Sequence, residues 1–189
     1  SKRYPLKNDF FGLHQKIAVP ILATRGCPYS CFNYCTYPLQ QGRKVRARSV
    51  GNLIKEIRHW QSNIGSSKFV FRDPVFSINR KHTIELCEEI IRQKLNITFM
   101  IETHLNNMDD QMIRLLKDAG LELVYVGVES SNHVVLKDMK RFTIEHDKQY
   151  EIIKKCQDAG IIVKTMFIIG NPEDTEDTIF ASIKYSKYL

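Results

Sequence analysis

Residues 17–35 read IAVPILATRGCPYSCFNYC, and this stretch sets the expectation for the whole fold. Its first eight residues form a run of strand length that is apolar up to Thr24, which predicts a buried strand with Pro20 as a local irregularity. The remainder holds Cys27, Cys31 and Cys35, three of the chain's five cysteines. Three thiols so close together after a strand favour metal or redox chemistry, because thiolates bind zinc and iron–sulfur clusters.

The spacing of these cysteines limits the backbone that can present them. On a straight helix Cys27 and Cys35 would lie about 12 Å apart along the axis, too far for one compact cluster. The segment is therefore predicted to wrap as a loop, which Gly26 and Pro28 permit. Three thiols leave one coordination position open, whereas structural zinc sites and electron-transfer clusters generally have four protein ligands. Zinc, for which no histidine stands nearby in the sequence, and three unliganded cysteines are the alternatives.

Strands and helices are predicted to alternate along the rest of the chain. Apolar runs predict five strands, at residues 17–24, 68–72, 97–102, 121–128 and 161–169. Helical spacing predicts five helices. The first follows Ser49, which would be its N-cap, and the second includes residues 84–91. The other three span 108–119, 143–159, with Thr143 as the cap, and 175–189. This alternation predicts an α/β fold with parallel strands joined by right-handed crossovers. We expect one domain over 17–189 after a lead-in at 1–16.

Composition gives weaker information about partners and location. The chain of 189 residues has a net charge of +7, and four basic side chains fall within residues 42–48. This segment is interpreted either as a solvated loop or as a contact for a phosphate-bearing ligand, an acidic partner domain or nucleic acid. The sequence has no apolar run of membrane-spanning length and begins without the apolar middle of a signal peptide, so a cytoplasmic protein is expected.

The cysteine loop resembles that of the radical S-adenosylmethionine (radical SAM) superfamily. Its hallmark is a C-x3-C-x2-C loop after the first strand of a partial (β/α) TIM-type barrel. The second gap here holds three residues, Phe32, Asn33 and Tyr34, and Tyr34 supplies the aromatic residue usual before the third cysteine. The resemblance covers nearly the whole chain and implies a radical SAM core of about five βα units, with a sixth missing or truncated.

The resemblance also implies a role for residues at the ends of the later strands. Cofactor contacts are expected from Tyr34, Arg72, Asp73, Glu102, Glu129, Ser130, Lys140, Arg141, Ile168, Gly170 and Asn171. Carboxylates and bare backbone suit a zwitterionic, ribose-bearing ligand, and Lys140 or Arg141 would meet its carboxylate. Each residue also has an ordinary structural explanation: Asp73 could cap a helix, and Glu129 could be a buried carboxylate paired with Lys140 or Arg141.

The activity implied by the resemblance is reductive cleavage of S-adenosylmethionine on a 4Fe–4S cluster held by Cys27, Cys31 and Cys35. The resulting 5′-deoxyadenosyl radical would abstract hydrogen from a substrate or support radical methyl transfer. An external electron donor such as flavodoxin or ferredoxin is implied. Residues 38–49 and 71–76 look most like cobalamin-dependent members, which usually carry a cobalamin-binding domain before the barrel and include methyltransferases and ring-forming enzymes.

Two alternatives differ in class. A tRNA methylthiotransferase-like enzyme would suit the positive charge and would bind tRNA in a salt-sensitive way. A catalytically degenerate iron–sulfur barrel acting as a binding module would keep iron but form no deoxyadenosine.

Overall fold

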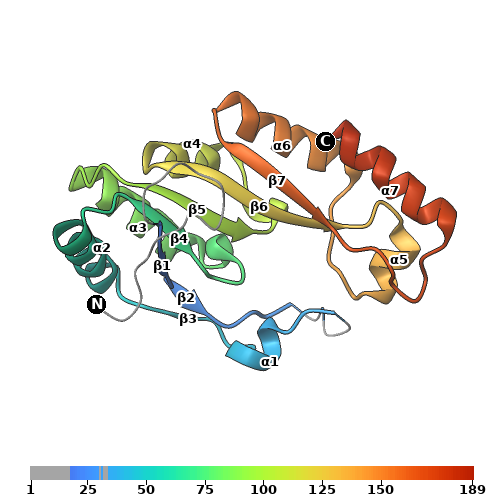
Figure 1. Ribbon diagram of the computed structural model, residues 1–189, viewed down its shortest axis with the longest axis horizontal. Helices are drawn as coiled ribbons and strands as arrows, with labels where there is room; N and C mark the ends of the chain where they lie inside the picture. Colours follow the sequence, from blue (N-terminus) through green and yellow to red (C-terminus); the bar gives the residue numbers. More distant parts are fainter. Residues whose placement is uncertain (1–17, 30, 32–33) are drawn as a thin grey trace.

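The computed structural model describes residues 18–29, 31 and 34–189, and a parallel five-stranded sheet is its centre (Figure 1). The strands are β1 (Ala18–Ile21), β4 (Lys68–Phe71), β5 (Thr98–Thr103), β6 (Leu121–Glu129) and β7 (Ile162–Phe167), adjacent in that order. Every neighbouring pair is parallel. Among the described residues β1 and β7 form the two edges, so the sheet is an open part of a barrel. The predicted α/β fold with five parallel strands is confirmed.

Four helices cover one face of this sheet. They are α2 (Val50–Ile64), α3 (Arg80–Arg92), α4 (Asp110–Asp118) and α6 (His146–Asp158), and α7 (Glu176–Tyr188) follows the last strand. Leu53, Leu86, Leu116 and Ile153 of these helices pack with Phe69 and other strand side chains in one large core. Burying such side chains away from water is the dominant force that holds helices on a sheet. The second core cluster, Val70, Met100 and Leu123, lies on the other face, because neighbouring strand residues point to opposite sides.

Several helix ends match the sequence expectation. Ser49 caps α2 by accepting a hydrogen bond from the backbone N–H of Asn52 at 3.4 Å. Thr175 and Thr178 form a reciprocal capping box at the start of α7. These side chains satisfy backbone donors that the first turn of a helix leaves unpaired.

Two predicted helix starts are wrong. The helix expected from 143 begins at His146 with Glu145 as N-cap, and the Thr143 hydroxyl instead accepts from the Gln149 side-chain amide at 3.2 Å. The helix expected from 108 begins at Asp110, because the Asp109 carboxylate caps it through the Met112 N–H at 2.8 Å. In both cases the predicted helix began a few residues N-terminal to its true start.

Short elements that the sequence did not predict surround the cysteine segment and one later loop. They are β2 (Thr24–Arg25), β3 (Arg46–Ala47), α1 (Tyr37–Gln41), α5 (His133–Asp138) and the 3-10 turns η1 (Phe76–Ile78) and η2 (Leu105–Asn107). Strands β2 and β3 pair antiparallel and lie, with α1, on the side of the sheet away from α4 and α6 (Figure 1). No described helix is both long enough and apolar enough to cross a membrane.

Candidate active site

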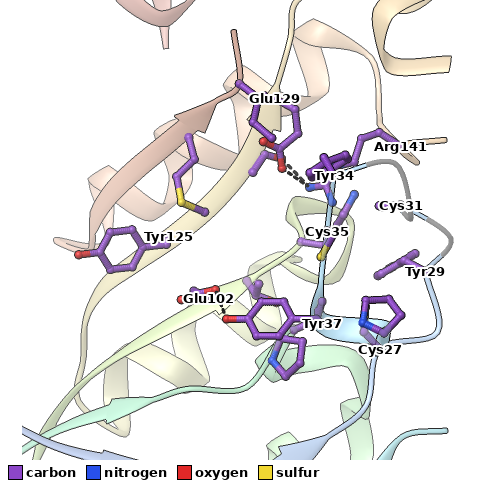
Figure 2. Close-up of a pocket in the computed structure, with 18 of the residues that line it drawn as sticks. Cys27, Tyr29, Cys31, Tyr34, Cys35, Tyr37, Glu102, Tyr125, Glu129 and Arg141 are labelled. Atoms are coloured by element: carbon purple, nitrogen blue, oxygen red, sulfur yellow. Dashed lines mark hydrogen bonds and ion pairs between the residues drawn. The ribbon is translucent and has the colours of Figure 1, made fainter. Parts of the chain in front are cut away.

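A cavity of about 570 Å³ opens at the carboxyl ends of the strands, where parallel βα folds place their ligands (Figure 2). The cysteine loop forms one side of it, and the ends of β5, β6 and β7 form the other. Many of the predicted site residues line this cavity, namely Cys27, Cys31, Tyr34, Cys35, Glu102, Glu129, Arg141 and Ile168. Residues more than a hundred positions apart in the sequence therefore face one space.

The base of the cysteine loop is fixed by hydrogen bonds to the last residue of α1 and to the residue after it. The Cys27 N–H donates to the Gly42 carbonyl at 3.0 Å, and the Gly26 N–H donates to the Gln41 side chain at 3.2 Å. Gly26 has φ +96, and a Cβ at this position would collide with the Lys44 carbonyl. Only glycine accepts that conformation and that approach, so Gly26 lets the loop leave β2 toward the cavity.

The three cysteines are free thiols that line the same cavity. Cys27 and Cys31 are buried and Cys35 is half-buried, and the Cys35 N–H closes a turn onto the Cys31 carbonyl at 3.0 Å. Burial raises the pKa of the Cys27 thiol, and the neighbouring Cys35 and Cys31 raise it further. Among the described residues, no three Cys, His, Asp or Glu side chains converge closely enough to hold a metal ion. The donor set fits an iron–sulfur cluster in number and chemistry, whereas the sulfur positions are not gathered into a finished site.

Glu129 stands at the end of β6 in an unusual backbone conformation. Its φ is +68, and the register between β6 and β7 shifts between Gly127 and Glu129. Side chains other than glycine rarely occupy this region, and such strain concentrates at functional sites. Gly127 makes the arrangement possible, since a Cβ there would collide with the Glu129 carboxylate. The strained backbone at Glu129 thus directs its carboxylate across the strand.

Arg141 joins this carboxylate to the cysteine loop. Its guanidinium lies 3.8 Å from Glu129 Oε1 and donates to the Gly127 carbonyl at 2.7 Å. Burial lowers the pKa of Arg141, but the neighbouring Tyr34, Glu129 and Cys31 side chains outweigh this and raise it. Tyr34 lies close enough to the same carboxylate to act on its pKa. Burial raises the pKa of Glu129, while Arg141 and Tyr34 oppose that rise. Figure 2 shows this group on the same side of the cavity as Cys31 and Cys35.

A second polar group lies at the end of β5. The Tyr37 hydroxyl donates to Glu102 Oε2 at 3.2 Å, and the Arg72 guanidinium binds Glu102 Oε1 at the same distance. Burial raises the pKa of Tyr37 to about 12, and Glu102 adds to this rise. The Tyr37 hydroxyl therefore stays protonated and holds α1 against the strand end (Figure 2).

The other predicted site residues lie outside the cavity lining. Arg72 pairs with Glu102, which lines the cavity, and Lys140 is exposed with φ +50, whereas Arg141 lines the cavity. Ser130 is buried and its hydroxyl accepts from the Asn132 N–H at 3.1 Å. The Gly170 and Asn171 N–H groups both donate to the Asp174 carboxylate at 2.9 Å, which orders the loop after β7.

Asp73 is fully buried, and its role is structural. Its carboxylate accepts from the Ala23 N–H at 3.1 Å, from the Thr24 hydroxyl at 2.6 Å and from the Thr24 N–H. Burial raises the pKa of Asp73, and these hydrogen bonds counter the rise. It therefore fixes the chain between β1 and β2, directly before the cysteine loop.

Replacing Asp73 by asparagine is expected to destabilise the protein by about 2–3 kcal/mol, because an amide group would face backbone N–H donors it cannot satisfy. The milder change Thr24→Val removes the hydroxyl donor but keeps a side chain of similar shape, and it should lower the free energy of unfolding by about 1–2 kcal/mol. Urea unfolding of both variants measures this. Equal stability of Asp73→Asn and the unmodified protein would contradict the structural role.

Aromatic residues of the site were missed by the sequence reasoning. Tyr29, Tyr37 and Tyr125 line the cavity, and Phe142 stacks on Tyr29 with centroids 6.5 Å apart. Tyr125 could have been found, because it shares the strand face of Gly127, two residues along. Tyr29 and Phe142 meet only through the tertiary fold.

His104 follows β5 and lines the cavity, and both of its ring nitrogens are engaged. Nε2 donates to the Phe142 carbonyl at 2.9 Å, and Nδ1 accepts from the Asn106 N–H at 3.2 Å. Burial lowers the pKa of His104 to about 4, and Arg141 lowers it too. The neutral ring is thus part of the packing between the cysteine loop and the segment after α5.

This pKa predicts a pH-dependent stability. Because the unfolded chain binds the proton near pH 6.5 and the folded protein only near 4, stability is complete above 6.5 and falls as the pH drops through that window. Between about pH 7.5 and 5.0 the loss should be roughly 2 kcal/mol. Urea unfolding of His104→Asn, which cannot titrate, should show less pH dependence. An unchanged dependence would assign the effect to other groups.

The fold and the cavity define a class: an open parallel (β/α) barrel with three free cysteines on the loop after its first strand, at the carboxyl-end mouth. The family model of the radical SAM superfamily matches residues 21–185. The chain belongs to this superfamily.

Three similar proteins illustrate the relationship. An uncharacterized methyltransferase of Pyrococcus horikoshii is 28% identical over 89% of this chain and 36% of its own length. An anaerobic magnesium-protoporphyrin IX monomethyl ester cyclase of Rubrivivax gelatinosus is 30% identical over 96% of this chain and 32% of its own length. The radical S-adenosylmethionine methyltransferase TsrM from Kitasatospora setae, solved with cobalamin and a [4Fe-4S] cluster, has a TM-score of 0.83 at 20% identity, covering 90% of this chain and 34% of TsrM. The chain spans about a third of the length of these relatives.

Proposed function

We propose that this protein binds a 4Fe–4S cluster through Cys27, Cys31 and Cys35 and cleaves S-adenosylmethionine reductively. When bound, such a cluster supplies the electron that splits the sulfonium into methionine and a 5′-deoxyadenosyl radical, which then abstracts hydrogen or supports methyl transfer. One observation carries the proposal: three free thiols and the Glu129–Arg141 pair line a single cavity at the strand ends.

The chain's own residues would bind and orient the cosubstrate. Of the described lysine and arginine side chains, Arg141 is the one that lines the cavity, so it is assigned to the methionine carboxylate in place of the exposed Lys140. Glu129 and Glu102 present carboxylates from β6 and β5 for hydroxyl or ammonium groups. Ile168, whose N–H donates to the Glu129 carbonyl at 2.9 Å, adds an apolar wall. The protein's part is therefore orientation and exclusion of water.

Anaerobic reconstitution with iron and sulfide tests the proposal. We expect about four irons per chain, and 5′-deoxyadenosine on addition of dithionite and S-adenosylmethionine. Bound iron without deoxyadenosine would favour the degenerate binding module instead.

We further propose a cobalamin-dependent methyltransferase or cyclase, with a cobalamin-binding domain beside this core in the full-length protein. The names of the relatives and the cobalamin bound to TsrM support this. Titration of the full-length protein with hydroxocobalamin should shift its absorption spectrum, and an unchanged spectrum would remove cobalamin from the proposal. The cysteines in free form and the need for an external electron donor suit the cytoplasm.

A further inference from the structure

We infer that the basic ribbon, defined as β2 together with residues 42–48, is the docking surface for an acidic one-electron carrier protein. The inference rests on the proposed function, because it concerns how an electron reaches the cysteine loop. Arg25, Arg43, Lys44, Arg46 and Arg48 of the ribbon are all exposed. Residues 42–48 contain no Asp or Glu, and Arg48 is paired with Glu56 at 2.6 Å. The ribbon thus presents a concentrated positive surface.

The ribbon carries an unfavourable pairing within itself. Arg25 and Arg46 stand directly opposite each other where β2 pairs antiparallel with β3. Like charges at such positions destabilise a two-stranded ribbon. Arg46 turns its guanidinium to the Lys44 and Gln41 carbonyls, at 2.9 and 2.8 Å, which holds the charge in place without neutralising it. A surface that keeps such repulsion is well suited to an acidic partner, which would relieve it.

The ribbon also contacts the cysteine loop from outside the cavity. Gly42 accepts the Cys27 N–H at 3.0 Å, and the Arg43 guanidinium donates to the Pro28 carbonyl at 3.0 Å. None of the ribbon's basic residues belongs to the cavity lining. A protein docked here would lie against the backbone that carries Cys27 and would leave the cavity open to small molecules.

These features fit a transient electron-transfer complex. Such encounters bury little surface and depend on complementary charge, which speeds association and weakens as salt rises. In the step itself, one electron leaves the reduced carrier and enters the oxidised cluster, whose total charge falls by one. No bond or proton changes hands.

The experiment measures binding and two sources of electrons in the full-length reconstituted protein. The variant Arg25→Glu/Lys44→Glu reverses two ribbon charges, and Lys81→Glu/Lys184→Glu makes the same change on α3 and α7 as a control. Binding of a negatively charged bacterial flavodoxin is followed by its flavin fluorescence at several salt concentrations. Deoxyadenosine formation is then driven either by reduced flavodoxin or by dithionite.

We expect salt-sensitive flavodoxin binding that is roughly tenfold weaker in the ribbon variant and within about twofold in the control. Flavodoxin-driven turnover at subsaturating flavodoxin should fall in parallel, while dithionite-driven turnover stays the same. Arg25→Glu alone should not lower the melting temperature, because it replaces a like-charge pair with an opposite one.

Equal flavodoxin affinity in the ribbon variant and the unmodified protein would overturn the docking surface. The docking surface would also be overturned if the unmodified protein bound tRNA through these residues and did not bind flavodoxin. Failure of dithionite-driven turnover in every variant would instead count against the proposed function, and the binding data would still decide the docking surface.

Discussion

Replacing Cys31 by alanine is expected to reduce reconstituted iron from about four per chain to less than one and to abolish deoxyadenosine formation. A thiolate is required to bind iron, and alanine leaves too few ligands to hold a cluster. The fold should survive, because Cys31 lies in the loop and outside the large apolar core. Iron analysis, visible absorption and product chromatography on the anaerobically purified protein measure the effect.

Cys87 offers a matched control on the same chain. It is fully buried on α3 in the large core, and burial raises the pKa of its thiol to about 12. Cys87→Ala should keep its iron and its deoxyadenosine yield while losing about 1–2 kcal/mol of stability through the small cavity it creates. Retention of four irons by Cys31→Ala, or loss of iron in Cys87→Ala alone, would move the cluster away from the loop.

The main sheet was predictable because long apolar runs dominate local choices. Strands β1, β4, β5 and β6 each have at least one face in the core, and Val163 of β7 packs against it, so the hydrophobic residues identify these strands whatever the loops between them. The ribbon of β2 and β3 was not predictable, since two residues per strand carry no periodicity. Its pairing depends on contacts across the cysteine loop, such as the Arg48 N–H to the Ala23 carbonyl at 2.9 Å.

The positions of the site residues were predictable, but the directions of their side chains were less so. Strand ends were the right places to look, because parallel strands bring their carboxyl ends together. Which neighbour faces the cavity depends on backbone torsions that the sequence does not reveal. Lys140 and Arg141 are adjacent cations, and the structure places Arg141 in the cavity lining while Lys140, in a left-handed backbone conformation, is exposed. Asp73 shows the same limit, since its carboxylate turns toward Thr24 and away from the cavity.

Removing Arg141 is expected to have the second large effect, on both stability and cosubstrate binding. The Arg141 and Glu129 side chains are 13% and 10% exposed, so Arg141→Met would leave a carboxylate buried without its cation. Breaking one partner of a buried pair costs about 3–5 kcal/mol. The same variant should lose measurable S-adenosylmethionine binding in equilibrium dialysis, since Arg141 supplies a cation to the cavity lining and no other lysine or arginine of the described part of the chain does.

Two further variants separate charge from packing. Arg141→Met/Glu129→Gln removes both charges and should recover at least about 1 kcal/mol of the loss, because no buried carboxylate remains unpaired. Cosubstrate binding should stay absent in this double variant, so the effect on stability is separated from the effect on binding. Lys140→Met, next along the chain and exposed, should change stability by less than about 0.5 kcal/mol and keep binding. If the double variant is no more stable than Arg141→Met, the cost lies in packing around the guanidinium, and the pairing with Glu129 contributes little to holding the cysteine loop against β6.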